Sequence, residues 1–441
     1  MTSRMQTFLG RKFVGLSLAT AAVTAGALVF VPGYGASGGS NAKTSAASPG
    51  RAVAPSGSAT GSTSTRPTGT QQPRPATRFT ITSGGDILLH LSVNHHAKTA
   101  TGYDYTKLLK AIQPWIEGSD LSLCALEVPI VPPGEKPSNY PAFGSPPQIA
   151  DSLKAMGWDG CALATNHSMD RGFKGVSSTI ENFERVGLGH AGTARTQDES
   201  SKIQYYTVRS GGRDVVVAHL SATTLTNGIP FPKGKEWSWN VVGDQGRRAV
   251  KDLVADAKRA RKAGASIVVV SMHWGTEYVT QPIAEQKKIG RELADSGEID
   301  LVFGNHSHVA EPVTTLKGGP GGRGMPVVWS MGNTVSGQLI ENHGYGVVTG
   351  LMTTATVEVP AKGKPRVTGL EWTTLAQDQR TFRVFPLAEL KKGARPQGMT
   401  LSRAEIEARE KSIYPVMATG SQSERTEAPK PQGRLVGNER K

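Results

Sequence analysis

Short apolar segments rich in β-branched residues alternate with amphipathic segments through the middle of the chain. The apolar segments predict buried strands at residues 79–83, 121–126, 160–164, 214–220, 266–272, 301–303 and 326–330. The amphipathic segments, several of which end at a glycine as helices often do, predict helices at residues 105–117, 147–156, 176–186, 247–263 and 284–296. Alternating strands and helices predict an α/β fold, with a mostly parallel core sheet and helices on its faces.

The hydrophobic pattern changes after Gly346. Residues 350–359 and 365–375 alternate between apolar and polar positions, and a polar turn of Lys, Gly and Pro separates them. This pattern predicts an antiparallel hairpin that completes a second sheet. Further along, residues 403–412 predict a short helix before a stretch rich in Pro, Gly and charges. We therefore expect residues 396–441 to form a short helix and a disordered tail.

The chain begins with two segments that differ from the predicted domain. Residues 1–35 place basic side chains before a long apolar run, which predicts an export signal. The run is long enough to span a bilayer and no clean cleavage pattern follows, so a cleaved signal peptide and a retained membrane anchor stay open. Residues 36–77, made mainly of Ser, Thr, Gly, Ala and Pro, predict a disordered tether. The domain at residues 78–395 is thus expected to be extracytoplasmic, either membrane-anchored or secreted to the cell wall.

Charge and cysteine content narrow the range of partners. The formal net charge is +14, which favours anionic partners, and for an exported protein these are wall or capsule polymers. No basic run is interleaved with aromatic residues, so we expect no nucleic-acid partner. The two cysteines, Cys124 and Cys161, lie in predicted apolar strands, and the sequence leaves their pairing open.

Polar side chains able to bind metals stand at the carboxyl ends of the predicted strands. In an open α/β sheet these ends meet at one edge, so we expect the side chains to lie close together. Any one of them alone is more often a structural residue, but six at one edge favour a metal centre. Their oxygen and nitrogen atoms suit borderline divalent metals. The six residues are Asp86, Glu127, Asn166, His273, His306 and His308.

The order of these motifs resembles the CapA-like capsule-synthesis family. The matching motifs are Gly85-Asp86, Ala125-Leu126-Glu127, Asn166-His167-Ser168-Met169-Asp170-Arg171-Gly172, His273-Trp274-Gly275-Thr276-Glu277, Gly304-Asn305-His306-Ser307-His308-Val309 and Ser330-Met331-Gly332-Asn333. That family is known for poly-γ-glutamate capsule production and is similar to the calcineurin-like metallophosphoesterase superfamily. The resemblance, over residues 78–390, implies a metallophosphoesterase-like two-sheet α/β/β/α sandwich.

The resemblance also implies roles for individual residues. Two divalent metal ions, of the Mn, Fe or Zn type, are expected as cofactors. Asp86, Glu127 and His308 would hold one ion. Glu127, Asn166, His273 and His306 would hold the other, so that Glu127 bridges the two.

His167 matches the superfamily position that contacts the substrate and protonates the leaving group. Asp170 is expected either to orient this imidazole or to serve as an acid at a helix N-terminus.

Two departures from the phosphoesterase pattern qualify these roles. Leu88 stands where phosphoesterases carry a histidine, and His90 is an alternative ligand two residues further on. Glu127 replaces an aspartate, and the arginine that usually follows it is missing. These departures bear on phosphoesterase activity more than on the fold. Trp274 and Glu277 either line the site or pack behind it.

Two functions remain open at this level. The first is an exported metal-dependent hydrolase that cleaves a phosphoester or, as a lesser alternative, a polymer amide; the ligand set and His167 favour it. The second is a non-catalytic polymer-binding or assembly component of a capsule synthesis and export complex. The predicted anchor and tether favour this second function. Under both, the expected partners are an anionic polymer such as poly-γ-glutamate, the membrane through the N-terminal segment, and capsule synthesis or export subunits.

Overall fold

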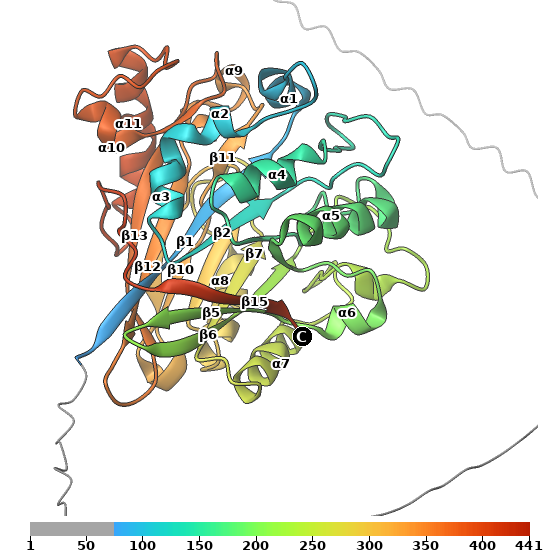
Figure 1. Ribbon diagram of the computed structural model, residues 1–441, viewed down its shortest axis with the longest axis vertical. Helices are drawn as coiled ribbons and strands as arrows, with labels where there is room; N and C mark the ends of the chain where they lie inside the picture. Colours follow the sequence, from blue (N-terminus) through green and yellow to red (C-terminus); the bar gives the residue numbers. More distant parts are fainter. Residues whose placement is uncertain (1–74) are drawn as a thin grey trace, which may run out of the picture. The chain divides into compact units, whose positions relative to one another are not determined.

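Two β-sheets pack against each other in the described part of the chain, residues 75–441 of a computed structural model (Figure 1). The predicted export signal and residues 36–74 of the predicted tether lie outside the described range. Thr77, the last residue of the predicted tether, already belongs to the first strand. No helix between residues 75 and 441 is long and apolar enough to cross a membrane.

The first sheet has a parallel core extended by antiparallel strands. Strand β1 pairs in parallel with β2 and with β11, and β2, β3 and β4 continue the parallel arrangement. On the other side of β1, strands β12, β13 and β14 are antiparallel to their neighbours. The strands in spatial order are β14 (Val384–Pro386), β13 (Arg366–Gln377), β12 (Leu351–Val359), β1 (Thr77–Leu88), β2 (Leu121–Leu126), β3 (Gly160–Ala162) and β4 (Gly189–Ala191), with β11 (Asn333–Ser336) beside the end of β1.

The second sheet also has a parallel core. Strands β6, β7, β8 and β10 are parallel, and antiparallel strands flank them on both sides. The spatial order is β15 (Arg434–Arg440), β5 (Gln204–Ser210), β6 (Arg213–Thr223), β7 (Ile267–His273), β8 (Leu301–Asn305), β10 (Met325–Val328) and β9 (Val313–Leu316).

Helices cover the outer face of each sheet. The first sheet packs against α1 (Leu91–Ala97), α2 (Thr106–Leu109), α3 (Gln113–Glu117), α4 (Gln148–Ala155) and α5 (Gly172–Val186). The second sheet packs against α7 (Val250–Lys262) and α8 (Ala284–Asp295). The remaining helices are α6 (Gln197–Ser201), α9 (Ile340–His343), α10 (Leu387–Lys391) and α11 (Arg403–Met417), with short 3-10 turns at Lys110–Ile112, Glu236–Ser238, Pro320–Gly322 and Tyr345–Val348. This arrangement confirms the predicted α/β/β/α sandwich with parallel core strands.

Strand β7 shows why the core strands read as continuous apolar runs. Ile267 and Val269 join the cluster between the two sheets, whereas Val268 and Val270 join the cluster under α7 and α8. Both faces of the strand are therefore buried, and neither face needs polar residues.

The antiparallel hairpin is confirmed, but the prediction that it completes a second sheet is wrong. Strand β12 pairs with β1 along most of its length, so the hairpin of β12 and β13 extends the first sheet. The apolar alternation of the hairpin identifies its buried face but not its neighbouring strand, which depends on tertiary pairing.

The predicted disordered tail is also corrected. The helix at residues 403–412 continues to Met417, and residues 434–440 form β15, which pairs antiparallel with β5. The tail has little apolar character, but backbone hydrogen bonds to an edge strand order it without requiring many buried side chains.

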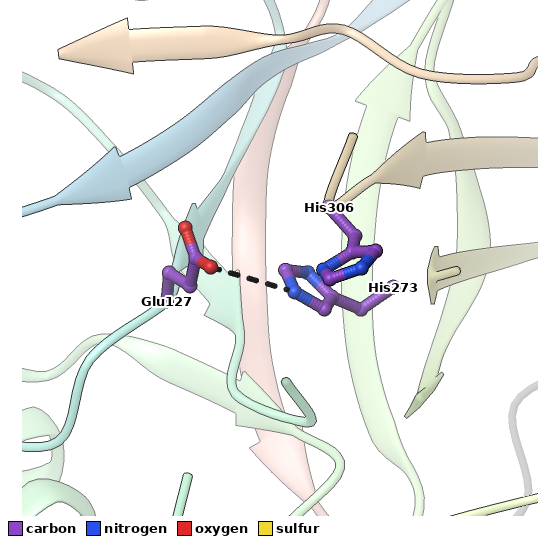
Figure 2. A group of neighbouring side chains, drawn as sticks. All are labelled: Glu127, His273 and His306. Atoms are coloured by element: carbon purple, nitrogen blue, oxygen red, sulfur yellow. Dashed lines mark ion pairs between the residues drawn. The ribbon is translucent and has the colours of Figure 1, made fainter. Parts of the chain in front are cut away.

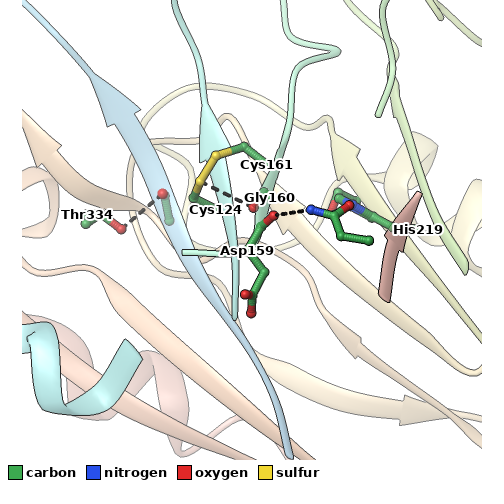
Figure 3. The surroundings of a disulfide bond; sticks show 9 residues. Cys124, Asp159, Gly160, Cys161, His219 and Thr334 are labelled. Carbon is green, nitrogen blue, oxygen red and sulfur yellow. Dashed lines mark hydrogen bonds between the residues drawn. A yellow bond between two sulfur atoms is a disulfide. The ribbon is translucent and has the colours of Figure 1, made fainter. Parts of the chain in front are cut away.

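Cys124 and Cys161 face each other on the neighbouring strands β2 and β3 and form a disulfide, with their Cα atoms 4.3 Å apart (Figure 3). The pairing that the sequence left open is therefore present. The disulfide joins the two strands that lead to Glu127 and Asn166.

Candidate metal centre

Strand β1 brings Asp86 into the centre of the molecule. The strand was expected to end near this residue, yet it runs on to Leu88 with a register irregularity at Asp86. A Cβ atom on Gly85 would lie 2.1 Å from the carbonyl oxygen of Gly332, so only glycine allows this approach. The Asp86 amide then donates a hydrogen bond to the same oxygen at 2.8 Å. Gly85 thus fixes the position of the carboxylate beside β11.

The other five predicted ligands come from the ends of four further strands. Glu127 directly follows β2, and His273 is the last residue of β7. The other three lie in loops after β3 and β8, namely Asn166, His306 and His308. His306 and His308 both have positive φ angles, 100° and 59°. Such angles are rare for residues other than glycine and cluster at functional sites.

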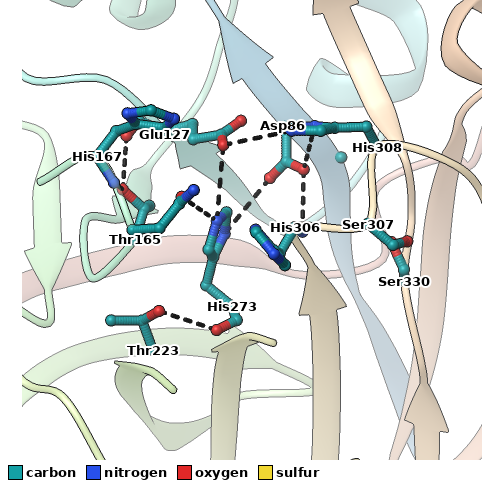
Figure 4. Close-up of polar contacts among 12 residues, drawn as sticks. Asp86, Glu127, Thr165, His167, Thr223, His273, His306, Ser307, His308 and Ser330 are labelled. Carbon is teal, nitrogen blue, oxygen red and sulfur yellow. Dashed lines mark hydrogen bonds and ion pairs between the residues drawn. The ribbon is translucent and has the colours of Figure 1, made fainter. Parts of the chain in front are cut away.

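The structure brings the six predicted ligands together. Figure 4 shows Asp86, Glu127, His273, His306 and His308 close to one another, and Asn166 joins them through its contact with His273. Glu127, His273 and His306 form one group, drawn in Figure 2, and Asp86, Glu127 and His308 form another. Within each group the potential ligand atoms lie within 4.8 Å of one another. Glu127 belongs to both groups, as expected of a bridging carboxylate. No other group of this kind occurs between residues 75 and 441.

Asn166 completes the second group. Its Oδ1 lies 2.8 Å from Nε2 of His273, and its Nδ2 donates a hydrogen bond to Asn227 at 3.2 Å. The amide is therefore oriented with its oxygen toward the histidine and its nitrogen away. This orientation presents the ligating oxygen to the same space as His273.

The carboxylates of the site lack the hydrogen-bond partners that burial demands. Asp86 and Glu127 are both fully buried. Both oxygens of Glu127 and Oδ1 of Asp86 have no hydrogen-bond partner, and neither has Nδ1 of His306. Oδ2 of Asp86 accepts a hydrogen bond from the His306 amide at 3.0 Å. Buried polar atoms of proteins are nearly always satisfied, so this cluster fits bound cations.

The pKa shifts agree with a cation site. Burial raises the pKa of Glu127 well above its usual range, and burial lowers the pKa values of His273 and His306 well below theirs. Neutral imidazoles offer the lone pairs that metal ligation needs. Burial alone would lower the pKa of His308, but the nearby Glu127 and Asp86 carboxylates outweigh it and raise the value to about 9. A protonated His308 thus places one positive charge beside the two carboxylates.

His167 and Asp170 form a hydrogen-bonded pair next to this cluster. Nδ1 of His167 lies 2.7 Å from Oδ2 of Asp170, which also accepts a hydrogen bond from the Phe143 amide at 2.7 Å. The Phe143 ring packs edge-on against the imidazole with the ring centres 4.8 Å apart. Helix α5 begins only at Gly172 and has no acid in its first turn. Asp170 therefore holds the imidazole by a hydrogen bond and lies before the helix, not in its first turn.

The other predicted neighbours of the site belong to neither ligand group. His90 accepts a hydrogen bond from the Gly337 amide at 3.0 Å through Nδ1, and it joins neither ligand group. Trp274 is fully buried and stacks with Trp329, so it packs behind the site. Glu277 is half-exposed, with Oε1 4.0 Å from Nε2 of His308.

Asn333 contributes to the site although no role was assigned to it. Its Oδ1 lies 3.1 Å from Nδ1 of His308, and its Nδ2 donates to the Val347 carbonyl at 2.9 Å. The signal was present, because Asn333 ends the last of the ordered motifs. Only its tertiary position shows that it orients a histidine, a use common around metal sites.

The comparisons with known proteins agree with the motifs. Residues 80–338 match the family model described as bacterial capsule synthesis protein PGA_cap. The chain belongs to this family. The predicted relationship to capsule-synthesis proteins is thereby confirmed, and the matched residues include all six predicted ligands.

Individual relatives show partial coverage. The capsule biosynthesis protein CapA of Bacillus anthracis is 26% identical over 268 residues, which cover 59% of this chain and 60% of that protein. A probable polyglutamine synthesis accessory protein of Mycobacterium tuberculosis is 26% identical over 293 residues, covering 58% of this chain and 74% of that protein. The chain thus spans about 60% of the length of the Bacillus relative.

Among solved structures, a calcineurin-like phosphoesterase, YfkN from Bacillus subtilis, aligns with 78% of this chain and 99% of that chain, with a TM-score of 0.38 and 12% identity.

Proposed function

We propose that this member of the capsule-synthesis family is a metal-dependent hydrolase that acts on an anionic polymer at the cell surface. The observation that carries the proposal is the pair of buried ligand groups that share Glu127, with the His167–Asp170 pair beside them. A site that only held a polymer would not call for an oriented histidine next to the ligands.

In this proposal the predicted ligands hold two divalent cations. Asp86, Glu127 and His308 would hold one divalent cation, and Glu127, Asn166, His273 and His306 would hold the other. Such ions, of the Mn, Fe or Zn type, polarise a bound phosphoryl or carbonyl oxygen and lower the pKa of water. Asn333 orients His308 through its side-chain oxygen.

His167 would supply the proton for the leaving group. Because Nδ1 is engaged by Asp170, Nε2 is the nitrogen left to hold a proton next to a substrate. Asp170 acts as a positioning residue, since it fixes the ring and, through the Phe143 amide, the loop that covers it. Both residues lie in the motif that follows β3.

We argue the proposed polymer and the proposed location from the family of the chain and from its net charge. Capsule polymers made of glutamate are anionic, and the chain carries a formal net charge of +14. The relatives are named for capsule and polyglutamine synthesis. We place the domain outside the cytoplasm, anchored or exported by residues 1–35. Capsule synthesis or export subunits are the proposed protein partners.

A second candidate is a non-catalytic polymer-binding or assembly component. The low exposure of the six predicted ligands favours this candidate, because none of them is more than 5% exposed. A polymer backbone has little direct access to side chains buried to this extent. The departures at Leu88 and Glu127 from the phosphoesterase pattern point the same way.

One experiment separates the two functions. Purified full-length protein would be analysed for metal content, and then incubated with an aryl phosphodiester and with poly-γ-glutamate of defined length. The hydrolase proposal expects bound divalent metal and cleavage of one of these substrates, lost on chelation and restored by Mn²⁺ or Zn²⁺. Protein that is loaded with metal, retains poly-γ-glutamate and cleaves neither substrate would establish the second candidate instead.

A further inference from the structure

A cavity of about 380 Å³ lies apart from the candidate metal centre. Residues from β4, α6, β5, β6, α7 and β15 line it, and none of the six predicted ligands does. Figure 1 shows the C-terminal strand β15 beside β5, ending close to α6. The volume falls within the range of sites that take small molecules.

The walls of this cavity carry an excess of positive charge. The charged lining residues are Lys202, Glu236, Arg247, Arg248, Asp256, Arg259 and Arg440. Asp256 pairs with two of them, Arg248 at 2.6 Å and Arg259 at 2.7 Å. One carboxylate therefore compensates two guanidinium groups. No ion pair of the described residues includes Arg247 or Arg440, so the cavity stays cationic.

Arg440 makes its direct contacts in this cavity without an ion pair. It donates hydrogen bonds to the Thr193 and Glu199 carbonyls at 2.9 and 3.0 Å, and its Nη1 lies 2.8 Å from Nδ1 of His190. These partners are neutral groups, because burial also lowers the pKa of His190. Nε of Arg440 has no hydrogen-bond partner at all. Burial lowers the pKa of the guanidinium, while the Glu199 and Glu184 carboxylates act in the opposite direction.

The deeper wall presents neutral polar atoms that also lack partners. His219 is fully buried, with Nε2 2.9 Å from the hydroxyl of Ser271, while its Nδ1 has no partner. The Thr193 hydroxyl, 5% exposed as a residue, is likewise unpartnered. Trp237 and Trp239 add an aromatic surface to the same cavity. Unsatisfied buried polar atoms are rare, and several of them around one cavity indicate a ligand.

We propose that this cavity, here called the anion pocket, is a second binding site for a small organic anion that bears a carboxylate or phosphate group. Arg247 and the unpartnered Nε–H of Arg440 bind the anionic group, since guanidinium N–H groups donate to both carboxylates and phosphates. His219 and Thr193 bind polar atoms at the inner end of the ligand, and Trp237 packs against its body. Because Arg440 enters the pocket on β15, the site exists only when the C-terminal residues are paired with β5.

Calorimetric titration of the full-length protein tests this site. The probes are glutarate, inorganic phosphate and uncharged glutaramide, which separate carboxylate from phosphate recognition and control for size. Saturable binding of glutarate or phosphate, with none for glutaramide, is expected. Arg440→Gln removes the charge and keeps a shorter polar side chain, so it should weaken binding about tenfold or more. Arg434→Gln, an exposed arginine of the same strand, is the matched control and should bind as the natural protein does.

A second variant distinguishes loss of a ligand contact from loss of strand β15. Arg247→Gln changes a lining residue that lies outside β15, and it should weaken binding of the same probe while circular dichroism and metal content stay unchanged. Absence of saturable binding for both anions would overturn the proposal. Equal weakening by Arg434→Gln and Arg440→Gln would do so as well, because it would reduce the effect to overall charge.

Discussion

The candidate metal centre and the anion pocket are both lined by buried polar atoms without partners, but the first is built around two carboxylates and the second around a guanidinium group. At the candidate metal centre Asp86 and Glu127 are fully buried carboxylates beside His273 and His306, whose pKa values are lowered, and His308, whose pKa is raised. In the anion pocket Arg440 is a guanidinium held by neutral carbonyls and a neutral imidazole. Buried carboxylates attract cations and a buried guanidinium attracts an anion. We therefore expect cations to bind in the first region and an anion to bind in the second.

The two regions also arise differently along the chain. The metal centre is assembled from residues at or beside the ends of core strands, where parallel strands converge by construction. The anion pocket is assembled from segments between residues 191 and 259 together with Arg440, nearly at the end of the chain. A polar group at a strand end is conspicuous in a sequence, whereas a distant arginine is not.

The largest expected effect is the loss of the metal centre itself. His306→Ala removes one nitrogen ligand from the group of Glu127, His273 and His306, so bound metal and any hydrolysis should fall to background. Elemental analysis of purified protein measures the first effect, and phosphodiester cleavage measures the second. His95→Ala, at an exposed histidine, is the control and should change neither. Normal metal content in the His306 variant would contradict the assignment of the first region as a cation site.

His167→Ala separates chemistry from metal binding. The side chain belongs to neither ligand group, so metal content should stay at the level of the natural protein. Turnover should fall by about 10²–10⁴, the range for loss of a general acid. Steady-state kinetics on metal-loaded protein provide the measurement. Unchanged turnover at full metal occupancy would remove the role assigned to this residue.

Loss of the disulfide should affect the two regions unequally. Replacement of both Cys124 and Cys161 by Ala opens a link across 37 positions of sequence, which should lower the free energy of unfolding by about 3–4 kcal/mol. Urea unfolding with and without reductant measures this change, and reductant should not affect the double variant. Because the link joins β2 and β3, metal affinity should drop while glutarate binding in the anion pocket stays constant. Equal losses at both sites would contradict the independence of the two regions.

The smallest effect concerns a buried carboxylate near the metal centre that is not a predicted ligand. Glu311 is fully buried, its Oε2 accepts a hydrogen bond from Gln286 at 2.9 Å, and burial raises its pKa to about 7. The folded protein thus holds a proton that the unfolded chain loses near its ordinary pKa of 4.5. The stabilising contribution is complete below that value and is lost as pH rises to about 7, by at most about 3 kcal/mol.

Glu311→Gln should remove this part of the pH dependence, because an amide does not titrate in this range. Urea unfolding at a series of pH values compares the variant with the natural protein, and Glu181→Gln, at an exposed glutamate, is the control. Identical pH slopes for the natural protein and the Glu311 variant would show that this carboxyl does not hold its proton in the folded state.

The sequence by itself determined the layered α/β class, most core strands and the six residues that meet at the candidate metal centre. It could do so because strands buried on both faces are written as continuous apolar runs, as in β7. Polar residues that interrupt such runs at their carboxyl ends stand out against them. His306 and Glu127, 179 positions apart, were grouped by this rule without any distance information.

Tertiary structure alone decided what depends on pairing between distant segments. The hairpin of β12 and β13 joined the first sheet because β12 found β1 as its neighbour. The tail became ordered because the edge of β5 was free to accept β15, and backbone hydrogen bonding leaves no mark in the side-chain pattern. The same pairing carried Arg440 into a cavity more than 180 residues away from it in sequence. Neither the pocket nor its charge could be read from the chain, since both result from which segments meet.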